Sequence, residues 1–183
     1  MERCRMLFSG SGGQGVITAS IIFAEAAVLY EGLNAVQSQE YGAAARGGAA
    51  RSDVIISDSD INYPKVIQTN ILICLTQKAY DTYQNIVRPE GFILTDTYHV
   101  KLNEKSNAKQ VELPMYKTII NEIGKSIVFN ICVLGAVLKL TDIVKKESVM
   151  NTIKNYIPVD FHDLNNRALE IGMALAEEKS DLK

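Results

Sequence analysis

Short apolar segments alternate with helical patterns along the first hundred residues. An apolar run from Met6 to Phe8 precedes a glycine-rich stretch, and the apolar range 16–30 then predicts a helix. Four more strands are predicted, at 35–36, 52–56, 71–75 and 92–95. A helix from Gln77 to about Val87, capped by Thr76, separates the last two strands. Pro89-Glu90-Gly91 predicts a turn into the fifth strand.

The second half of the chain has a helical pattern. Four helices are predicted from Pro114 onward, at 115–123, 128–140, about 147–156 and 161–178. Alternation of strands and helices implies a parallel sheet. We therefore expect an α/β fold with an open, mostly parallel, Rossmann-like sheet, helices on both faces and a helical C-terminal part, in one domain spanning 1–183. In such a sheet, the second strand would end beside the first.

Charge and hydropathy exclude several classes of partner. The chain has 183 residues, of which 47% are hydrophobic, and its 19 basic residues are balanced by 21 acidic ones without a basic stripe. Binding to nucleic acid or to an anionic membrane is therefore not expected. The apolar range 127–138 is shorter than the ~20 residues that a membrane span needs. No signal peptide is visible, and we expect a cytoplasmic protein.

Cysteine and histidine positions do not predict a metal or catalytic site. Cys4, Cys74 and Cys132 are odd in number and far apart, without a C-x-x-C pair, so they suggest neither an iron–sulfur cluster nor a disulfide framework. His99 and His162 are expected at the surface without a role. We predict no catalytic residue and no metal ligand in this chain.

The glycine-rich stretch is the first candidate site. Gly10, Gly12 and Gly15 match the spacing of a dinucleotide-binding loop between a strand and a helix, where backbone N–H groups suit a phosphate. Such a site also needs an acidic residue at the end of the second strand to bind a ribose. That strand ends in the range 37–40, where Glu40 is the only acid. An independent NAD- or flavin-binding oxidoreductase therefore stays as an alternative.

A second glycine-rich loop, 41–48, follows the second strand and carries Arg46. Two glycine loops would then share one sheet edge, which could hold an anionic group or accept another protein chain. The predicted helix 16–30 has one charge, Glu25, so its own sheet or another chain must cover it nearly all round. The candidate binding residues are Gly12, Gly13, Gln14, Gly15, Tyr41, Arg46, Gly47 and Gly48.

Taken together, these motifs resemble the gamma subunit of 2-oxoacid:ferredoxin oxidoreductases, most closely the 2-oxoglutarate type. The resemblance rests on the order and spacing of short motifs along nearly the whole chain. They lie at 10–16, 39–42, 46–48, 53–58, 62–64, 71–80, 130–141 and 164–165. The second loop departs from a frequent family form, with Glu40 where Ser is common and Ala43-Ala44 where Pro-Glu is common.

The resemblance implies a subunit of an enzyme that converts a 2-oxoacid, coenzyme A and oxidised ferredoxin into acyl-CoA, carbon dioxide and reduced ferredoxin. Alpha, beta and ferredoxin-like delta subunits would supply thiamine diphosphate, Mg²⁺ and 4Fe–4S clusters, and this chain alone would bind no cofactor and be inactive. Its two loops would line a coenzyme A path or a subunit interface, with Arg46 placed to meet phosphate. A gamma subunit of a pyruvate, 2-oxoisovalerate or indolepyruvate enzyme is the related alternative.

Overall fold

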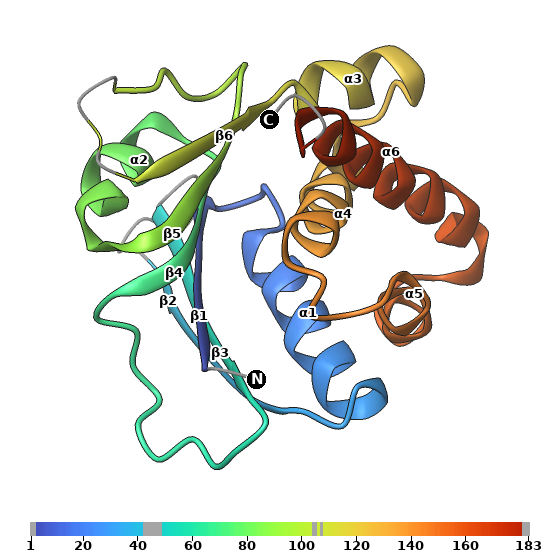
Figure 1. Ribbon diagram of the computed structural model, residues 1–183. Helices are drawn as coiled ribbons and strands as arrows, with labels where there is room; N and C mark the ends of the chain where they lie inside the picture. Colours follow the sequence, from blue (N-terminus) through green and yellow to red (C-terminus); the bar gives the residue numbers. More distant parts are fainter. Residues whose placement is uncertain (1–2, 42–48, 104–105, 107, 181–183) are drawn as a thin grey trace.

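A computed structural model describes residues 3–41, 49–103, 106 and 108–180. The described residues contain a six-stranded sheet in the order β2–β3–β1–β4–β5–β6 (Figure 1). Its strands are β1 (Cys4–Ser11), β2 (Asn34–Tyr41), β3 (Ala49–Ser57), β4 (Thr69–Cys74), β5 (Val87–Asp96) and β6 (Lys109–Leu113). The pairs β1–β4, β4–β5 and β5–β6 are parallel, whereas β3 runs antiparallel to both of its neighbours. The mostly parallel sheet is confirmed.

Helices cover the two faces of this sheet unequally. One face carries α1 (Val16–Tyr30), α4 (Phe129–Thr141), α5 (Lys146–Ile153) and α6 (His162–Ser180), and α3 (Met115–Glu122) packs into the same core (Figure 1). On the other face lies α2 (Gln77–Tyr83). Three short 3-10 helices complete the described elements: η1 (Gln84–Ile86), η2 (Ser126–Val128) and η3 (Val159–Phe161). None of the helices described is long and apolar enough to cross a membrane.

The two cores follow from the alternation of side chains along buried strands. Met6 and Phe8 of β1 point into the large core beneath α1 and α4, while Leu7 between them points to the smaller core beneath α2. In β4, Ile71 and Leu72 divide in the same way. Both strands are buried on two faces there, which explains why 6–8 and 71–74 are apolar at every position.

Helix α4 is an inner layer between the sheet and α6. Every residue from Phe129 to Leu138 is buried, so this helix has no polar face. Two glycines bring α6 against it: a Cβ on Gly172 would collide with the carbonyl oxygen of Cys132, and one on Gly135 would collide with that of Leu169. The close approach of the two helices therefore requires glycine at both positions.

Several predicted boundaries are wrong. Pro89-Glu90-Gly91 lies inside β5 and does not form the predicted turn; there, Val87 pairs with Thr69 but Phe92 pairs with Ile71, so the extra residues form a bulge. The predicted helix from Gln77 ends at Tyr83, followed by η1. Strand β6 was not predicted, and β2 runs through the polar residues to Tyr41, because an edge strand tolerates polar side chains.

Candidate functional site

The carboxyl ends of five strands meet at one edge of the sheet. Ala50 of β3 lies between two of these ends. It pairs with Gly10 of β1 on one side and with Tyr41, the last residue of β2, on the other. Cys74 of β4 lies beside Ser9 of β1 and beside Thr95 of β5. The carboxyl ends of β1 and β2, which precede the two glycine-rich stretches, therefore lie at this edge.

The second strand does not lie beside the first, which corrects one expectation. Strand β3 stands between them and runs the other way, because β2 and β3 form a hairpin that inserts its second strand next to β1. The end of β2 and the first glycine loop therefore lie at the same edge, separated by β3. Arg46, Gly47 and Gly48 lie outside the described residues, and for Tyr41 only the backbone position is described.

The first loop connects β1 to α1 through two glycines in the left-handed region. Gly13 has φ 96° and Gly15 has φ 70°, a conformation that other residues rarely adopt. Gly12 and Gly13 are exposed at the sheet edge. Gly15 stands at the N-terminus of α1, where no side chain caps the helix. This loop therefore offers bare backbone to whatever approaches the edge.

Gln14 closes the loop from inside. Its Oε1 accepts a hydrogen bond from the backbone N–H of Ser11 at 2.8 Å, and its Nε2 donates to the carbonyl of Leu75 at 3.0 Å. A Cβ on Gly10 would stand 2.6 Å from that Oε1. The amide thus occupies the crevice between the ends of β1 and β4, where a nucleotide lies in folds of this type.

The dinucleotide alternative fits this geometry poorly. Glu40 is exposed near the end of β2, two strands away from β1, so it does not stand where a ribose-binding acid is required. The N–H of Ser11 is already bound by Gln14. The literal glycine spacing therefore produces a tight strand-to-helix turn without the partners of a dinucleotide site.

Asn130, at the start of α4, packs on the first loop. It is buried, and its Nδ2 lies 3.4 Å from the carbonyl oxygen of Gly15. A Cβ on Gly15 would stand only 2.5 Å from the same nitrogen. Glycine is therefore required at position 15 for two reasons: the backbone has a positive φ, and a side chain there would collide with Asn130. Sequence reasoning did not identify Asn130 as part of the site.

His99 is not a free surface residue, which corrects the expectation. Its Nδ1 lies 2.9 Å from Oδ1 of Asp96, a carboxylate that is fully buried at the end of β5. Asp96 also accepts the backbone N–H groups of Tyr98, at 3.0 Å, and Tyr116, at 2.7 Å. The three-residue spacing between Asp96 and His99 was the available signal. His162, by contrast, lies with Nε2 2.8 Å from the carbonyl oxygen of Ile157, away from this edge.

The cysteines are ill suited to nucleophilic chemistry. Burial raises the pKa of the Cys4 thiol to about 11, and it raises the pKa values of Cys74 and Cys132 further still. The thiol form therefore dominates at neutral pH, whereas a cysteine nucleophile or metal ligand must be a thiolate. No group of three or more His, Cys, Asp or Glu side chains among the described residues could hold a metal ion.

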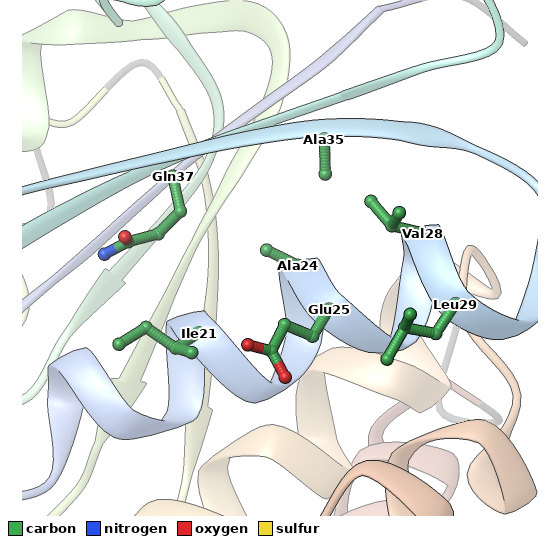
Figure 2. A pocket seen from close by; sticks show the side chains of 7 residues that line it. All are labelled: Ile21, Ala24, Glu25, Val28, Leu29, Ala35 and Gln37. Atoms are coloured by element: carbon green, nitrogen blue, oxygen red, sulfur yellow. The ribbon is translucent and has the colours of Figure 1, made fainter.

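A separate groove of about 410 Å³ lies on the outer flank of α1, beside the edge strand β2 (Figure 2). Val28 and Leu29 are exposed along it, so the sheet does not cover the whole apolar surface of α1. Glu25 projects into the same region and accepts a hydrogen bond from the Tyr156 hydroxyl, whose pKa this bond raises to about 12. The residues that line the groove are Ile21, Ala24, Glu25, Val28, Leu29, Ala35 and Gln37. None of them belongs to the predicted binding set.

Comparison with known proteins identifies full-length relatives. A family model described as pyruvate ferredoxin/flavodoxin oxidoreductase matches residues 5–175. The 2-oxoglutarate synthase subunit KorC of Methanocaldococcus jannaschii is 40% identical over 178 residues, covering 96% of this chain and 95% of that protein. The pyruvate/ketoisovalerate oxidoreductases common subunit gamma of Thermococcus litoralis is 32% identical over 168 residues, covering 88% and 90%.

Two solved structures share the fold. The keto/oxoacid ferredoxin oxidoreductase gamma subunit of Geobacter sulfurreducens superposes with a TM-score of 0.87 at 39% identity, covering 97% of this chain and 98% of that one. The 2-oxoglutarate:ferredoxin oxidoreductase of Magnetococcus marinus, solved with 2-oxoglutarate, coenzyme A and succinyl-CoA bound, superposes with a TM-score of 0.88 at 18% identity. The match covers 97% of this chain but 32% of the Magnetococcus chain, where the same fold is one segment of a longer polypeptide.

Proposed function

The chain belongs to the pyruvate ferredoxin/flavodoxin oxidoreductase family, as a gamma subunit of 2-oxoacid:ferredoxin oxidoreductases, and from this we propose that it serves a 2-oxoglutarate enzyme. The observation that carries the proposal is the 40% identity to a 2-oxoglutarate synthase subunit over 96% of the chain. Identity to the gamma subunit shared by pyruvate and ketoisovalerate enzymes is lower, at 32% over 88%.

In the proposed reaction, 2-oxoglutarate, coenzyme A and oxidised ferredoxin yield succinyl-CoA, carbon dioxide and reduced ferredoxin. The side chains of this chain do not fit Mg²⁺ or a 4Fe–4S cluster as ligands. Its three cysteines are dispersed, and the described residues hold no cluster of metal-binding side chains. We therefore assign thiamine diphosphate, Mg²⁺ and the 4Fe–4S clusters to the alpha, beta and ferredoxin-like delta subunits. No catalytic residue is assigned to this chain.

The contribution proposed for this chain is to shape the coenzyme A path and to support assembly. The exposed backbone of Gly12 and Gly13 stands at the edge where the second loop, with Arg46, Gly47 and Gly48, leaves β2. Bare N–H groups and a guanidinium suit the phosphates of coenzyme A. Gln14 and Gly15 then act as positioning residues, since they fix the turn that presents this backbone.

Reconstitution of the enzyme tests the proposed substrate. The gamma chain is co-expressed with the alpha, beta and delta subunits from the same genome, and ferredoxin reduction is measured with 2-oxoglutarate, pyruvate, 2-oxoisovalerate and indolepyruvate. We expect turnover to be highest with 2-oxoglutarate, and the complex without the gamma chain to be inactive. Preference for another of these 2-oxoacids, or full activity without the gamma chain, would reject the proposal.

Titration calorimetry of coenzyme A with the assembled complex tests the path. Arg46→Ala should weaken binding by about ten- to a hundredfold, since a charge-assisted hydrogen bond contributes ~1.5–3 kcal/mol and ~1.4 kcal/mol corresponds to tenfold. Lys65→Ala is the matched control, because Lys65 is an exposed cation in the segment that joins the end of β3 to the start of β4, and both of these strand ends lie at the opposite edge of the sheet. Equal affinities for wild type and Arg46→Ala would remove Arg46 from the coenzyme A path.

A further inference from the structure

Three aromatic side chains form a platform at the sheet edge that carries the first glycine loop. We call it the aromatic shelf and define it as Tyr98, His99 and Tyr116. The Tyr98 and Tyr116 rings are stacked, with centroids 4.9 Å apart and an interplanar angle of 23°. The His99 ring meets both edge-on, at centroid distances of 5.0 Å and 4.8 Å. Offset stacks and edge contacts at these separations are favourable.

Asp96 holds the shelf rigid. Its buried carboxylate binds the backbone N–H groups of Tyr98 and Tyr116 and also Nδ1 of His99, so all three residues of the shelf are fixed to one group. Stability of the fold explains one of these bonds, because the Asp96 carboxylate caps the start of α3 by accepting from the N–H of Tyr116. The fold does not need an exposed tyrosine on the outside of the stack.

The shelf adjoins the proposed coenzyme A path. Asp96 follows Thr95, which pairs with Cys74 at the end of β4, and Cys74 in turn pairs with Ser9 of β1. Phe129 packs against His99 and Tyr116, with centroids 5.5 Å apart in both cases. The next residue, Asn130, packs on Gly15 of the first loop. The shelf and the glycine loop are thus two parts of one edge, joined by the start of α4.

Tyr98 is 70% exposed although its ring is held in a stack, so a large aromatic surface is ordered and open to solvent. Aromatic side chains presented in this way stack with nucleobases, irrespective of the base. His99 uses Nδ1 for Asp96 and is 22% exposed, and among the described residues its Nε2 has no hydrogen-bond partner. As an imidazolium, it would donate from Nε2 to a phosphate oxygen.

We propose that the aromatic shelf binds an adenine nucleotide, with the adenine on Tyr98 and a phosphate at Nε2 of His99, and that this nucleotide is the adenosine end of coenzyme A. The assignment to coenzyme A rests on the proposed function. The pantetheine arm would then extend from the shelf along the edge toward the first glycine loop. Tyr98 and His99 are therefore binding residues, and Asp96 positions them.

Fragments of coenzyme A test this assignment on the assembled complex. Adenosine 3′,5′-bisphosphate carries the nucleotide of coenzyme A without the arm, pantetheine carries the arm alone, and ATP is a different adenine nucleotide. For Tyr98→Ala, we expect about a tenfold rise in the KM for coenzyme A and in the inhibition constant of the bisphosphate, from lost stacking. We expect kcat and the inhibition constant of pantetheine to stay unchanged.

Two matched variants complete the design. Tyr98→Phe keeps the stacking ring and should stay within about twofold of wild type for every ligand. Tyr63→Ala removes a tyrosine that is 55% exposed in the segment between β3 and β4, at the opposite edge, and should change nothing. Because Tyr98 is exposed, its truncation should leave folding intact, which circular dichroism checks.

Three results would overturn the proposal. Unchanged constants for coenzyme A and bisphosphate in Tyr98→Ala would show that the shelf is not in contact with the nucleotide. Equal changes for bisphosphate and pantetheine, or loss of complex assembly, would show a structural or subunit-contact role. Equal weakening of ATP and bisphosphate binding, with the KM for coenzyme A unchanged, would assign the shelf to another nucleotide. A complex that does not use coenzyme A at all would instead reject the proposed function.

Discussion

Replacement of Gly15 by alanine measures how tightly the first loop is built into the fold. The added Cβ destabilises the folded state in two ways. A left-handed backbone, here φ 70°, costs a residue with a Cβ ~1–2 kcal/mol. The Cβ also stands 2.5 Å from Nδ2, 2.7 Å from Cγ and 2.8 Å from Cβ of Asn130, and such overpacking costs ~1–3 kcal/mol. Gly15→Ala should therefore lower the free energy of unfolding by about 2–5 kcal/mol.

Gly13 is the internal control for the backbone cost. Its φ is 96°, but nothing lies within 4 Å of an added Cβ. Gly13→Ala should therefore lose only ~1–2 kcal/mol. Both variants are compared with wild type by urea denaturation monitored by circular dichroism, with equal m-values required before the free energies are compared.

A double-mutant cycle isolates the collision. Asn130→Gly removes the three atoms nearest to the new Cβ, and its own helix cost cancels in the cycle. In this background, Gly15→Ala should cost no more than Gly13→Ala does in wild type. A cost for Gly15→Ala that is the same with and without the Asn130 side chain would refute the reasoning, because the contact would then contribute nothing.

Three further variants test other contacts by denaturation. Asp96→Asn should lower stability by ~1–3 kcal/mol, since an amide cannot accept from all three donors that the carboxylate binds; wild-type stability would contradict this. Gly172→Ala should cost ~1–3 kcal/mol by forcing α6 off α4, and an unchanged melting temperature would show that the helices separate freely. Hydrogen bonds from Ser148 and from the backbone N–H of Lys145 lower the pKa of Glu31 below 4.5. The contribution of this carboxylate to the free energy of unfolding is therefore complete above about pH 4.5, and it is lost as the pH falls through the lower pKa of the folded state. Between pH 6 and pH 3, the free energy of unfolding should thus fall less for Glu31→Gln than for wild type. Parallel plots of this free energy against pH would exclude the role of Glu31.

Local patterns were enough to predict most of the elements. The helix predicted at 16–30 has the same bounds in the structure, because glycines end the strand before it and Gly32 follows it. Thr76 caps α2 as predicted, accepting from the N–H of Ala79. The direction of β3 was missed because this strand is apolar like a parallel one, although the segment between β2 and β3 is shorter than the roughly dozen residues that a parallel crossover needs.

Long-range partners limited the prediction of the site. The common edge of the ends of β1 and β2 was predicted although the predicted strand order was wrong, but the role of Gln14 depends on Leu75, which is 61 residues away in the chain. Asn130 contacts Gly15 across 115 residues. The pair Asp96 and His99 was within reach of sequence reasoning, because three residues separate them. It was missed because His99 was assessed for metal-ligand spacing, whereas its partner is a buried carboxylate at a strand end.

The central position of β1 has a consequence for synthesis on the ribosome. This strand is made before the other five described strands, so both of its neighbours, β3 and β4, come later, and the pairing with β3 reaches Ile56. At ~5–20 residues per second, roughly 2–10 s pass before that partner has been added to the chain. During this time β1 and the apolar helix α1 have no sheet to cover them. The nascent chain therefore exposes its most apolar segments longest, and expression at lower temperature or with chaperones should raise the yield of folded subunit.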